Sequence, residues 1–309
     1  MTAWLDDLNA VSPDVTAIAA ETPDDLMREI VDAEIVYGRL PKEPFLLAKN
    51  LKWVQSIGVG FETMLYPEMI ESDVVITNTA GAFDSAMAEH ALGLMFAFTR
   101  GVIFSERNRK SRNWNQNITL SQIDGRTACV LGLGSIGRAM ISRLAALGVT
   151  VTAVDAQVTS APDGVDNLFS PDQMLDAIAD ADFVLVALPL TEGTRGLINA
   201  ACFERMKDTS YLINVARGPI VNESDLINAL NAGKIAGAGM DVFEKEPLPK
   251  ESPLWEMENV VMIPHLGGRS EEGGGNMQQI FIENLRRYVN GEELMNIIDK
   301  QKGYLIQNV

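Results

Sequence analysis

The residue best suited to acid-base chemistry in this sequence is His265, one of two histidines in the chain. It stands in VVMIPHLGG, after a strand-like apolar run and Pro264, and before Gly267 and Gly268. Histidine titrates near neutrality and commonly donates or accepts protons in catalysis. A lone imidazole is more often a core residue, and that is our interpretation of His90 in the helical stretch MAEHALGLM. His265 instead follows a predicted parallel strand, where open α/β sheets bind their ligands, so we expect it at a ligand-binding edge.

A glycine pattern in VLGLGSIGRAM suggests a second chemical element, a site for a dinucleotide. Gly132, Gly134 and Gly137 follow the strand-like run ACVL and open a helical stretch, which is the context this motif requires. The first glycine allows a tight turn, the second lets the backbone approach a pyrophosphate, and the third lets the helix pack closely on the strand. The amides that begin the helix, at Ser135 and Ile136, would then bind the negative charge.

Asp155 ends the next predicted strand, VTVTAVD, where a carboxylate can accept both ribose hydroxyls of an adenosine. The alternative is an aspartate that caps a loop. A 2′-phosphate would be repelled by this carboxylate, and the following residues AQV offer no arginine to compensate. The sequence therefore favours NAD over NADP.

The bulk composition limits the classes of partner. Lys and Arg total 25 against 42 Asp and Glu, a net charge of −17 that disfavours nucleic acid and anionic membranes. We expect no metal site, because Cys129 and Cys202 have no histidine or second cysteine at ligand spacing. No apolar run approaches the length of a membrane span, and the N-terminal residues lack a signal-peptide pattern, so we expect a cytoplasmic protein. An acidic substrate would need a local positive group to overcome the overall charge.

The elements that must position these residues form an α/β pattern of two domains. From about residue 128, six apolar runs alternate with amphipathic helical stretches: ACVLGLG, VTVTAVD, DFVLVALP, SYLINVA, IAGAGMDVF and NVVMIPH. Continuous apolar strands separated by helices predict a parallel sheet buried on both faces, as in a doubly wound dinucleotide fold. The first part of the chain predicts a smaller α/β domain with strands in AEIVYG, LKWVQSIG and DVVITNT. No apolar strand precedes its helical stretch PDDLMREIVD.

We predict the domain boundary in the long helical stretch after Ser85, and we expect the tail EELMNIIDKQKGYLIQNV to return to the first domain. Residues 1–96 with 288–309 would form a substrate-binding domain, and residues 97–287 would form the NAD-binding Rossmann domain.

Taken together, the stretches GLGSIG, INVARGPIVNESDL, GMDVFEKEPLPKESPLW and MIPHLGG resemble the D-isomer-specific 2-hydroxyacid dehydrogenases, and the resemblance covers nearly the whole chain. It implies a Rossmann-type domain inserted into a flavodoxin-like domain, an active site in the cleft between them, and a homodimer joined through the cofactor domains. Carried over, Arg217, Glu246 and His265 match the catalytic arginine, glutamate and histidine of the family.

Chemistry supports each of these roles. Reducing a 2-oxo acid requires a hydride at the carbonyl carbon and a proton for the developing alkoxide, which His265 would supply. Glu246 would hydrogen-bond the imidazole and favour its charged form, so Glu246→Gln should lower the upper pH limit of reduction. Arg217, after SYLINVA, would bind the carboxylate through two hydrogen bonds and polarise the carbonyl. It is the local positive group that an acidic substrate needs.

The resemblance also implies the remaining contacts. Amides around Val59 and Gly60 would form a second carboxylate anchor, and Asp241 would hold the nicotinamide carboxamide. The residues that would line the cofactor site are Val215, Leu188, Pro189 and Gly267. Trp114 precedes the predicted cofactor domain core and is compatible with a dimer interface, a core position or the surface.

The leading hypothesis is a reductase of small 2-oxo acids that uses NAD(H), with glyoxylate and hydroxypyruvate slightly favoured because EPLPKESPLW is similar to stretches in glyoxylate/hydroxypyruvate reductases. A formate dehydrogenase would have glutamine in place of Glu246. The alternative from another class is an NAD-sensing corepressor-like protein of the same fold, which binds partner proteins without turnover.

Overall fold

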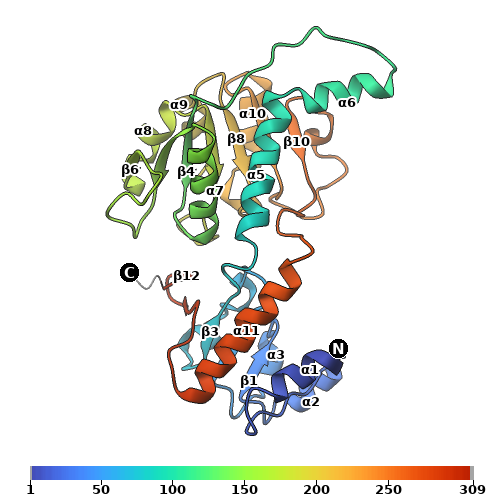
Figure 1. Cartoon of the computed structure of the whole chain (residues 1–309), viewed down its shortest axis with the longest axis vertical. Helices are drawn as coiled ribbons and strands as arrows, with labels where there is room; N and C mark the ends of the chain where they lie inside the picture. The colour runs from blue at the N-terminus through green and yellow to red at the C-terminus, as the bar shows by residue number, and fades with distance from the viewer. Residues whose placement is uncertain (1, 307–309) are drawn as a thin grey trace. The chain divides into compact units, whose positions relative to one another are not determined.

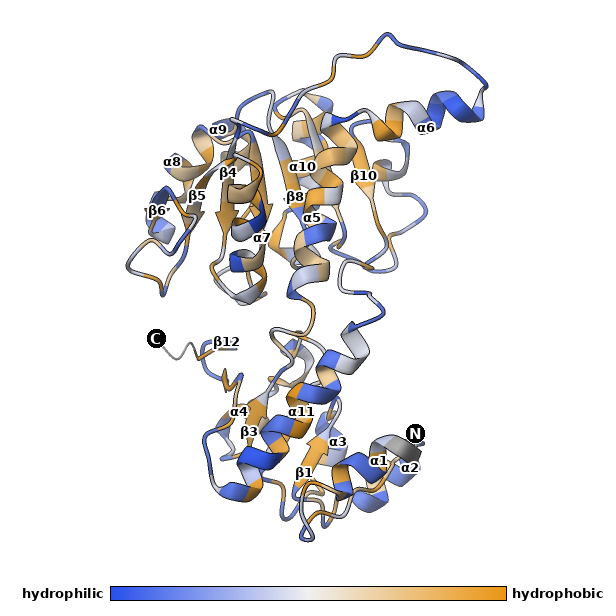
Figure 2. Ribbon diagram, in the orientation of Figure 1, coloured by the Kyte–Doolittle hydropathy of each residue, from blue (hydrophilic) through white to orange (hydrophobic). Residues whose placement is uncertain are grey.

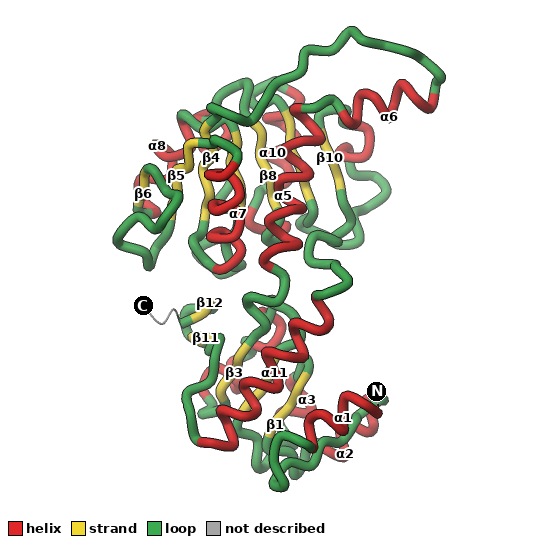
Figure 3. Tube along the Cα trace, viewed as in Figure 1, coloured by secondary structure: helices red, strands yellow, loops and turns green. Residues whose placement is uncertain are grey.

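The computed structural model describes residues 2–306 of the chain. It divides into two compact units, Met1–Ala82 with Ser270–Val309, and Phe83–Arg269 (Figure 1). Each unit contains its own parallel sheet (Figure 3). In the described residues, no helix combines the length and the apolar character needed to cross a membrane.

The second unit is built on a seven-stranded parallel sheet in the order β10-β9-β8-β7-β4-β5-β6. This is the doubly wound order of dinucleotide-binding folds extended by one strand, and the order reverses between β4 and β7. The strands are β4 Thr127–Leu131, β5 Thr150–Val154, β6 Asn167–Phe169, β7 Phe183–Val186, β8 Tyr211–Asn214, β9 Gly237–Met240 and β10 Val260–Met262. The six predicted strands are present, and β6 is the strand that the sequence pattern missed.

Helices cover both faces of this sheet, which explains why its central strands are mostly apolar (Figure 2). Successive side chains of β4 point to opposite faces: Ala128 and Val130 pack with α5 Asp84–Thr99 and α7 Ser135–Ala146, and Cys129 and Leu131 pack with the other helices. Those other helices are α8 Met174–Ala179, α9 Ala200–Arg205 and α10 Glu223–Asn231. Helix α6, Val102–Lys110, and the segment after it extend away from the sheet (Figure 1). Short 3-10 turns occur at η2 Pro171–Gln173, η3 Gly218–Ile220 and η4 Pro253–Glu256.

The first unit has a three-stranded parallel sheet in the order β1-β2-β3. Its elements are α1 Thr2–Asn9, α2 Pro23–Glu29, β1 Ile35–Tyr37, α3 Lys42–Phe45, β2 Trp53–Gln55, η1 Glu62–Met64, α4 Pro67–Glu71, β3 Val75–Thr77, α11 Gly273–Asn290, β11 Ile298–Asp299 and β12 Tyr304–Leu305. Among residues 2–306, no strand precedes α2, as the sequence indicated.

The unit boundaries differ from the predicted ones at 96/97 and 287/288. Helix α5 belongs wholly to the second unit, because its apolar residues, among them Leu94 and Met95, pack on the large sheet. Helix α11 belongs to the first unit, because Phe281 and Leu285 pack in one cluster with Trp53. Both boundaries therefore lie before α5 and α11, whereas the predicted boundaries lay within these helices.

The C-terminal tail packs within the first unit, as expected. Ile297 forms a β-bridge with Thr77 at the end of β3. The Lys300 ammonium donates to the carbonyls of Met69, Ser72 and Val74, at 3.0, 2.6 and 2.8 Å. Residues 307–309 of the predicted tail lie outside the described residues.

Candidate active site

His265 and Glu246 form a close pair near the carboxyl ends of β10 and β9. His265 Nδ1 lies 2.7 Å from Glu246 Oε2, and the other carboxylate oxygen accepts from the Phe243 amide at 3.0 Å. The two side chains are 51% and 36% exposed, so the pair is open to a ligand. Because Nδ1 faces the carboxylate, Nε2 is the nitrogen that could exchange a proton with a substrate.

The backbone of His265 is held in an unusual conformation by Asp241. His265 has φ +52°, a left-handed conformation that is uncommon for a non-glycine residue. Its amide donates to the Asp241 carbonyl at 2.8 Å, and the Asp241 carboxylate accepts from the amides of Leu266 and Gly267. A Cβ on Gly267 would lie 2.8 Å from that carboxylate, so glycine permits the close packing. Asp241 thus fixes the turn that presents the imidazole.

His90 was predicted to be an ordinary core histidine, and the structure gives it a specific neighbour. Its Nε2 lies 3.2 Å from Asp241 Oδ1, and its side chain is 18% exposed while that of Asp241 is 1% exposed. Burial of Asp241 favours the neutral acid, but His90 and the amides of Leu266 and Gly267 outweigh burial and hold the pKa of this carboxyl below its usual range. The helical pattern around His90 gave no sign of this pair, because it depends on a residue 151 positions later.

Arg217 follows β8 at the same edge of the sheet. Its guanidinium donates to the Ala216 carbonyl at 2.8 Å, and its own carbonyl accepts from Asn214 at 3.2 Å. A Cβ on the next residue, Gly218, would lie 1.8 Å from the Phe243 carbonyl, so this loop packs directly on the segment that leads to Glu246. The structure therefore brings the segments of the three predicted catalytic residues to one edge.

The glycine loop lies after β4 and has the local geometry that the motif requires. Gly132 has φ +102°, and a Cβ on it would lie 2.7 Å from the Ala187 carbonyl. A Cβ on Gly137 would lie 2.0 Å from the Gly132 carbonyl, whereas no atom lies within 4 Å of one built on Gly134. The first and third glycines are thus packed against protein backbone, and the second leaves open space over the start of α7. This combination fits a dinucleotide whose pyrophosphate approaches Gly134.

The side chains at the start of α7 also have protein partners. The Ser135 hydroxyl donates to Asp84 Oδ1 at 2.9 Å, a contact that the sequence pattern did not indicate. Ile136 lies in the first turn of α7 and packs against the core cluster on that face of the sheet. The predicted role of Ser135 and Ile136 rests on their backbone amides.

Asp155 directly follows β5 and contacts the glycine loop. One carboxylate oxygen accepts from the Leu133 amide at 2.7 Å, and the other accepts from Gln157 and Val158 at 2.7 and 3.0 Å. The capping role considered as an alternative is therefore present. A carboxylate has about four acceptor positions, so Asp155 can still bind a ribose hydroxyl.

The predicted cofactor-lining residues also follow strands of this sheet. Leu188 and Pro189 come after β7, and Leu188 lies 3.2 Å from the Cβ position of Gly132. Val215 comes after β8, and only 3% of its surface is exposed. A residue that contacts a ligand broadly would be more exposed than this in the free protein.

The predicted carboxylate anchor, around Val59 and Gly60, lies in the first unit after β2. The carbonyls of Val59 and Gly60 accept hydrogen bonds from Asn78 and Ser56, at 2.8 and 2.9 Å. Gly58 has φ +89°, which glycine adopts readily.

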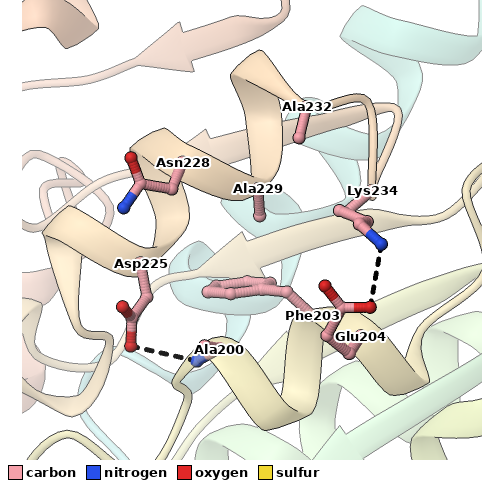
Figure 4. A pocket seen from close by; sticks show the side chains of 8 residues that line it. All are labelled: Ala200, Phe203, Glu204, Asp225, Asn228, Ala229, Ala232 and Lys234. Atoms are coloured by element: carbon pink, nitrogen blue, oxygen red, sulfur yellow. Dashed lines mark hydrogen bonds and ion pairs between the residues drawn. The ribbon is translucent and has the colours of Figure 1, made fainter.

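Other features of the described residues add no second site. They contain no group of three or more His, Cys, Asp or Glu side chains that could hold a metal ion. A hollow between α9 and α10 is lined by Ala200, Phe203, Glu204, Asp225, Asn228, Ala229, Ala232 and Lys234 (Figure 4). Its Lys234 and Glu204 are paired at 2.8 Å, and Asp225 accepts from the Ala200 amide at 3.0 Å. None of its residues is a predicted site residue.

Comparison with known proteins relates these features to a family. Residues 92–267 match the family described as D-isomer specific 2-hydroxyacid dehydrogenase, NAD binding domain. A glyoxylate reductase of Thermofilum pendens is 32% identical over 289 residues, 90% of this chain and 85% of that protein. Glyoxylate/hydroxypyruvate reductase B of Salmonella newport is 33% identical over 256 residues, 81% of this chain and 79% of that protein.

A solved structure shares the same fold. It is a D-isomer specific 2-hydroxyacid dehydrogenase from Xanthobacter autotrophicus Py2 in complex with NADPH and MES, with TM-score 0.85 and 31% identity, covering 98% of this chain and 96% of that one. Because that relative holds NADPH, the similarity supports a nicotinamide cofactor without favouring NAD over NADP.

Proposed function

Because the chain belongs to the D-isomer specific 2-hydroxyacid dehydrogenase family, we propose that it transfers a hydride between NAD(H) and a small 2-oxo acid, with glyoxylate and hydroxypyruvate as first candidates. The observation that carries the proposal is the 2.7 Å pair of His265 and Glu246 at the sheet edge that also bears the glycine loop. A bound nicotinamide supplies the hydride.

His265 is the proposed proton donor. With Nδ1 on the Glu246 carboxylate, protonated Nε2 donates to the substrate oxygen as that oxygen gains negative charge. Glu246 fixes the ring orientation and stabilises the imidazolium that must be present before each reduction. In the oxidation direction, the same nitrogen accepts the proton from the hydroxyl.

Arg217 is the proposed partner of the substrate carboxylate and carbonyl oxygen. A guanidinium presents parallel N–H donors that match a carboxylate, and its fixed charge polarises a carbonyl for hydride attack. The amides of Val59 and Gly60 are the proposed second anchor for the carboxylate. Asp241 is the proposed partner of the nicotinamide carboxamide in addition to its contacts with residues 266 and 267.

NAD is the proposed cofactor in preference to NADP. The Asp155 carboxylate beside the glycine loop would repel a 2′-phosphate, and Ala156 and Gln157, which follow it, carry no positive charge. The family contains proteins that bind NADPH, so this preference rests on Asp155 alone.

A homodimer formed through the second unit is also proposed. The segment after α6 exposes Trp114 at 90% and Leu120 at 46%, and α6 itself exposes Val102 at 56%. Because Trp114 is exposed, it is not a core residue. A dimer interface and the free surface are the two positions that its sequence context still allows. Apolar side chains on an extended segment are typical of a surface that a second copy covers, and sedimentation of wild-type protein against Trp114→Ser tests this.

The experiment that tests the function follows NADH absorbance in parallel reactions with glyoxylate, hydroxypyruvate, pyruvate and phenylpyruvate. We expect turnover with one or more of the smaller acids, and the order of kcat/KM then ranks the size of the substrate pocket. The proposal fails if NADH binds but none of the acids is reduced with either NADH or NADPH. That result would favour the corepressor-like alternative, in which partner binding replaces turnover.

A further inference from the structure

We propose that Ser56 and Asn78 are positioning residues that orient the backbone of residues 57–60 to bind the substrate carboxylate, an inference that rests on the proposed function. The loop itself lacks a charged side chain between residues 57 and 60, so any affinity for an anion must come from its backbone.

Three successive carbonyls of this loop are bound by donors from the protein interior. The Thr79 amide donates to Gly58 at 3.3 Å, the Asn78 side-chain amide donates to Val59 at 2.8 Å, and the Ser56 hydroxyl donates to Gly60 at 2.9 Å. The donor residues Ser56, Asn78 and Thr79 are fully buried.

The fixed carbonyls determine where the amides point. In a trans peptide the C=O and the following N–H point in opposite directions. Holding the carbonyls of residues 58–60 toward the interior therefore turns the amides of residues 59–61 away from it. Within residues 2–306, the amides of Val59, Gly60 and Phe61 have no acceptor. Adjacent unpaired backbone amides can bind an anion.

The C-terminal tail holds Asn78 in place. The Asn78 amide donates to the Asn296 carbonyl at 3.2 Å, and the Asn296 side chain donates to the carbonyls of Asn78 and Ala80 at 3.3 and 2.9 Å. Asn78 Oδ1 accepts from the Ala80 amide at 3.0 Å, which leaves its NH₂ group directed at Val59. The side chain is thus fixed at both ends, as a residue that orients a neighbouring loop must be.

The test uses Ser56→Ala, which removes a single oxygen and adds no bulk. The matched control is Ser72→Ala, which removes a hydroxyl that donates to the Met69 carbonyl at 2.8 Å at the C-terminal end of α4, in the same unit. Four quantities are measured for each protein: the Kd of NADH, the Kd of oxalate by calorimetry in the presence of NADH, and the KM and kcat for glyoxylate.

We expect Ser56→Ala to weaken oxalate binding and raise KM by about five- to tenfold, which corresponds to one lost hydrogen bond to a buried carbonyl. kcat and the Kd of NADH should change less than about twofold, and Ser72→Ala should match wild type in all four quantities. Asn78→Asp, which places an oxygen against the Val59 carbonyl, should have a larger effect of the same kind.

The inference is overturned if wild type does not bind oxalate, if Ser56→Ala binds it as wild type does, or if both serine variants lose affinity alike. Failure of the proposed function is seen separately, as wild type that binds oxalate but reduces no 2-oxo acid. The oxalate measurement still decides the inference in that case.

Discussion

Replacing Gly134 by alanine should weaken cofactor binding at least tenfold and leave the fold intact. Gly134 has φ −66° and ψ −175°, which alanine adopts readily, and no atom lies within 4 Å of the added Cβ. Replacing a glycine N-cap by alanine costs at most about 1 kcal/mol, the value for replacing a Ser, Thr, Asn or Asp cap, and the lower entropy of the unfolded chain offsets about 0.4–1 kcal/mol of that cost. The free energy of unfolding should therefore change by less than about 0.6 kcal/mol. Cofactor affinity should fall at least tenfold, about 1.4 kcal/mol, because the methyl group occupies the space through which the pyrophosphate approaches.

Gly137→Ala should instead destabilise the fold, with a smaller direct effect on cofactor affinity than Gly134→Ala. Its Cβ would lie 2.0 Å from the Gly132 carbonyl oxygen, so the backbone of α7 or of the loop must move. Such overpacking costs about 1–3 kcal/mol of folding free energy. Gly93→Ala is the control, since Gly93 lies in α5 with nothing within 4 Å of its Cβ, and this change should stabilise the fold by about 0.5–1 kcal/mol without affecting the cofactor.

Urea denaturation gives the stability of each variant, and quenching or enhancement of NADH fluorescence gives its affinity. The assignment of the glycine loop is refuted if Gly134→Ala binds NADH as tightly as wild type. It is also refuted if this variant is destabilised as much as Gly137→Ala, because the space over Gly134 would then be filled by protein.

Three further predictions concern charge and reactivity. Asp155→Asn should raise kcat/KM with NADPH relative to NADH by at least about tenfold, since it removes the charge that repels a 2′-phosphate; an unchanged ratio would place the specificity elsewhere. Cys129 and Cys202 should resist a thiol reagent until the protein unfolds, because burial raises the pKa of Cys129 to about 12 and also raises that of Cys202; rapid labelling in the native state would contradict this. The pKa of Asp241 is lower in the folded protein than in the unfolded chain. The ionised Asp241 carboxylate therefore stabilises the fold fully at pH values above the unfolded pKa, and this stabilisation is lost as the pH falls through the folded pKa. His90→Leu should therefore move the onset of acid unfolding to higher pH, and an unchanged acid transition would show that the pair does not contribute.

The sequence was most informative where buried strands leave continuous apolar runs. It predicted six strands of the large sheet and missed β6, Asn167–Phe169, because this short edge strand is only partly buried and lacks such a run. The predicted boundary within α5 was wrong because that helix carries apolar residues around its circumference, and periodicity then does not show which sheet it packs on.

Part of the candidate site could also be predicted from the strand pattern. Residues that follow parallel strands, such as Arg217 and His265, could be placed at one sheet edge from topology alone. The partners of Asp241 and Val59 could not be predicted from the sequence. His90 contacts Asp241 and Asn78 contacts Val59, and no local sequence pattern indicates either contact. Sequence reasoning therefore proposed the reacting groups but did not indicate His90 and Asn78, which contact their neighbours from distant parts of the sequence.

The most direct test of the account compares kcat of wild type and His265→Asn with glyoxylate or hydroxypyruvate at saturating NADH. We predict a loss of about 10²–10⁴-fold, the range for removing a general acid, with the Kd of NADH unchanged within about twofold. Activity within tenfold of wild type, with NADH still bound, would show that His265 does not supply the proton and would contradict the proposed mechanism.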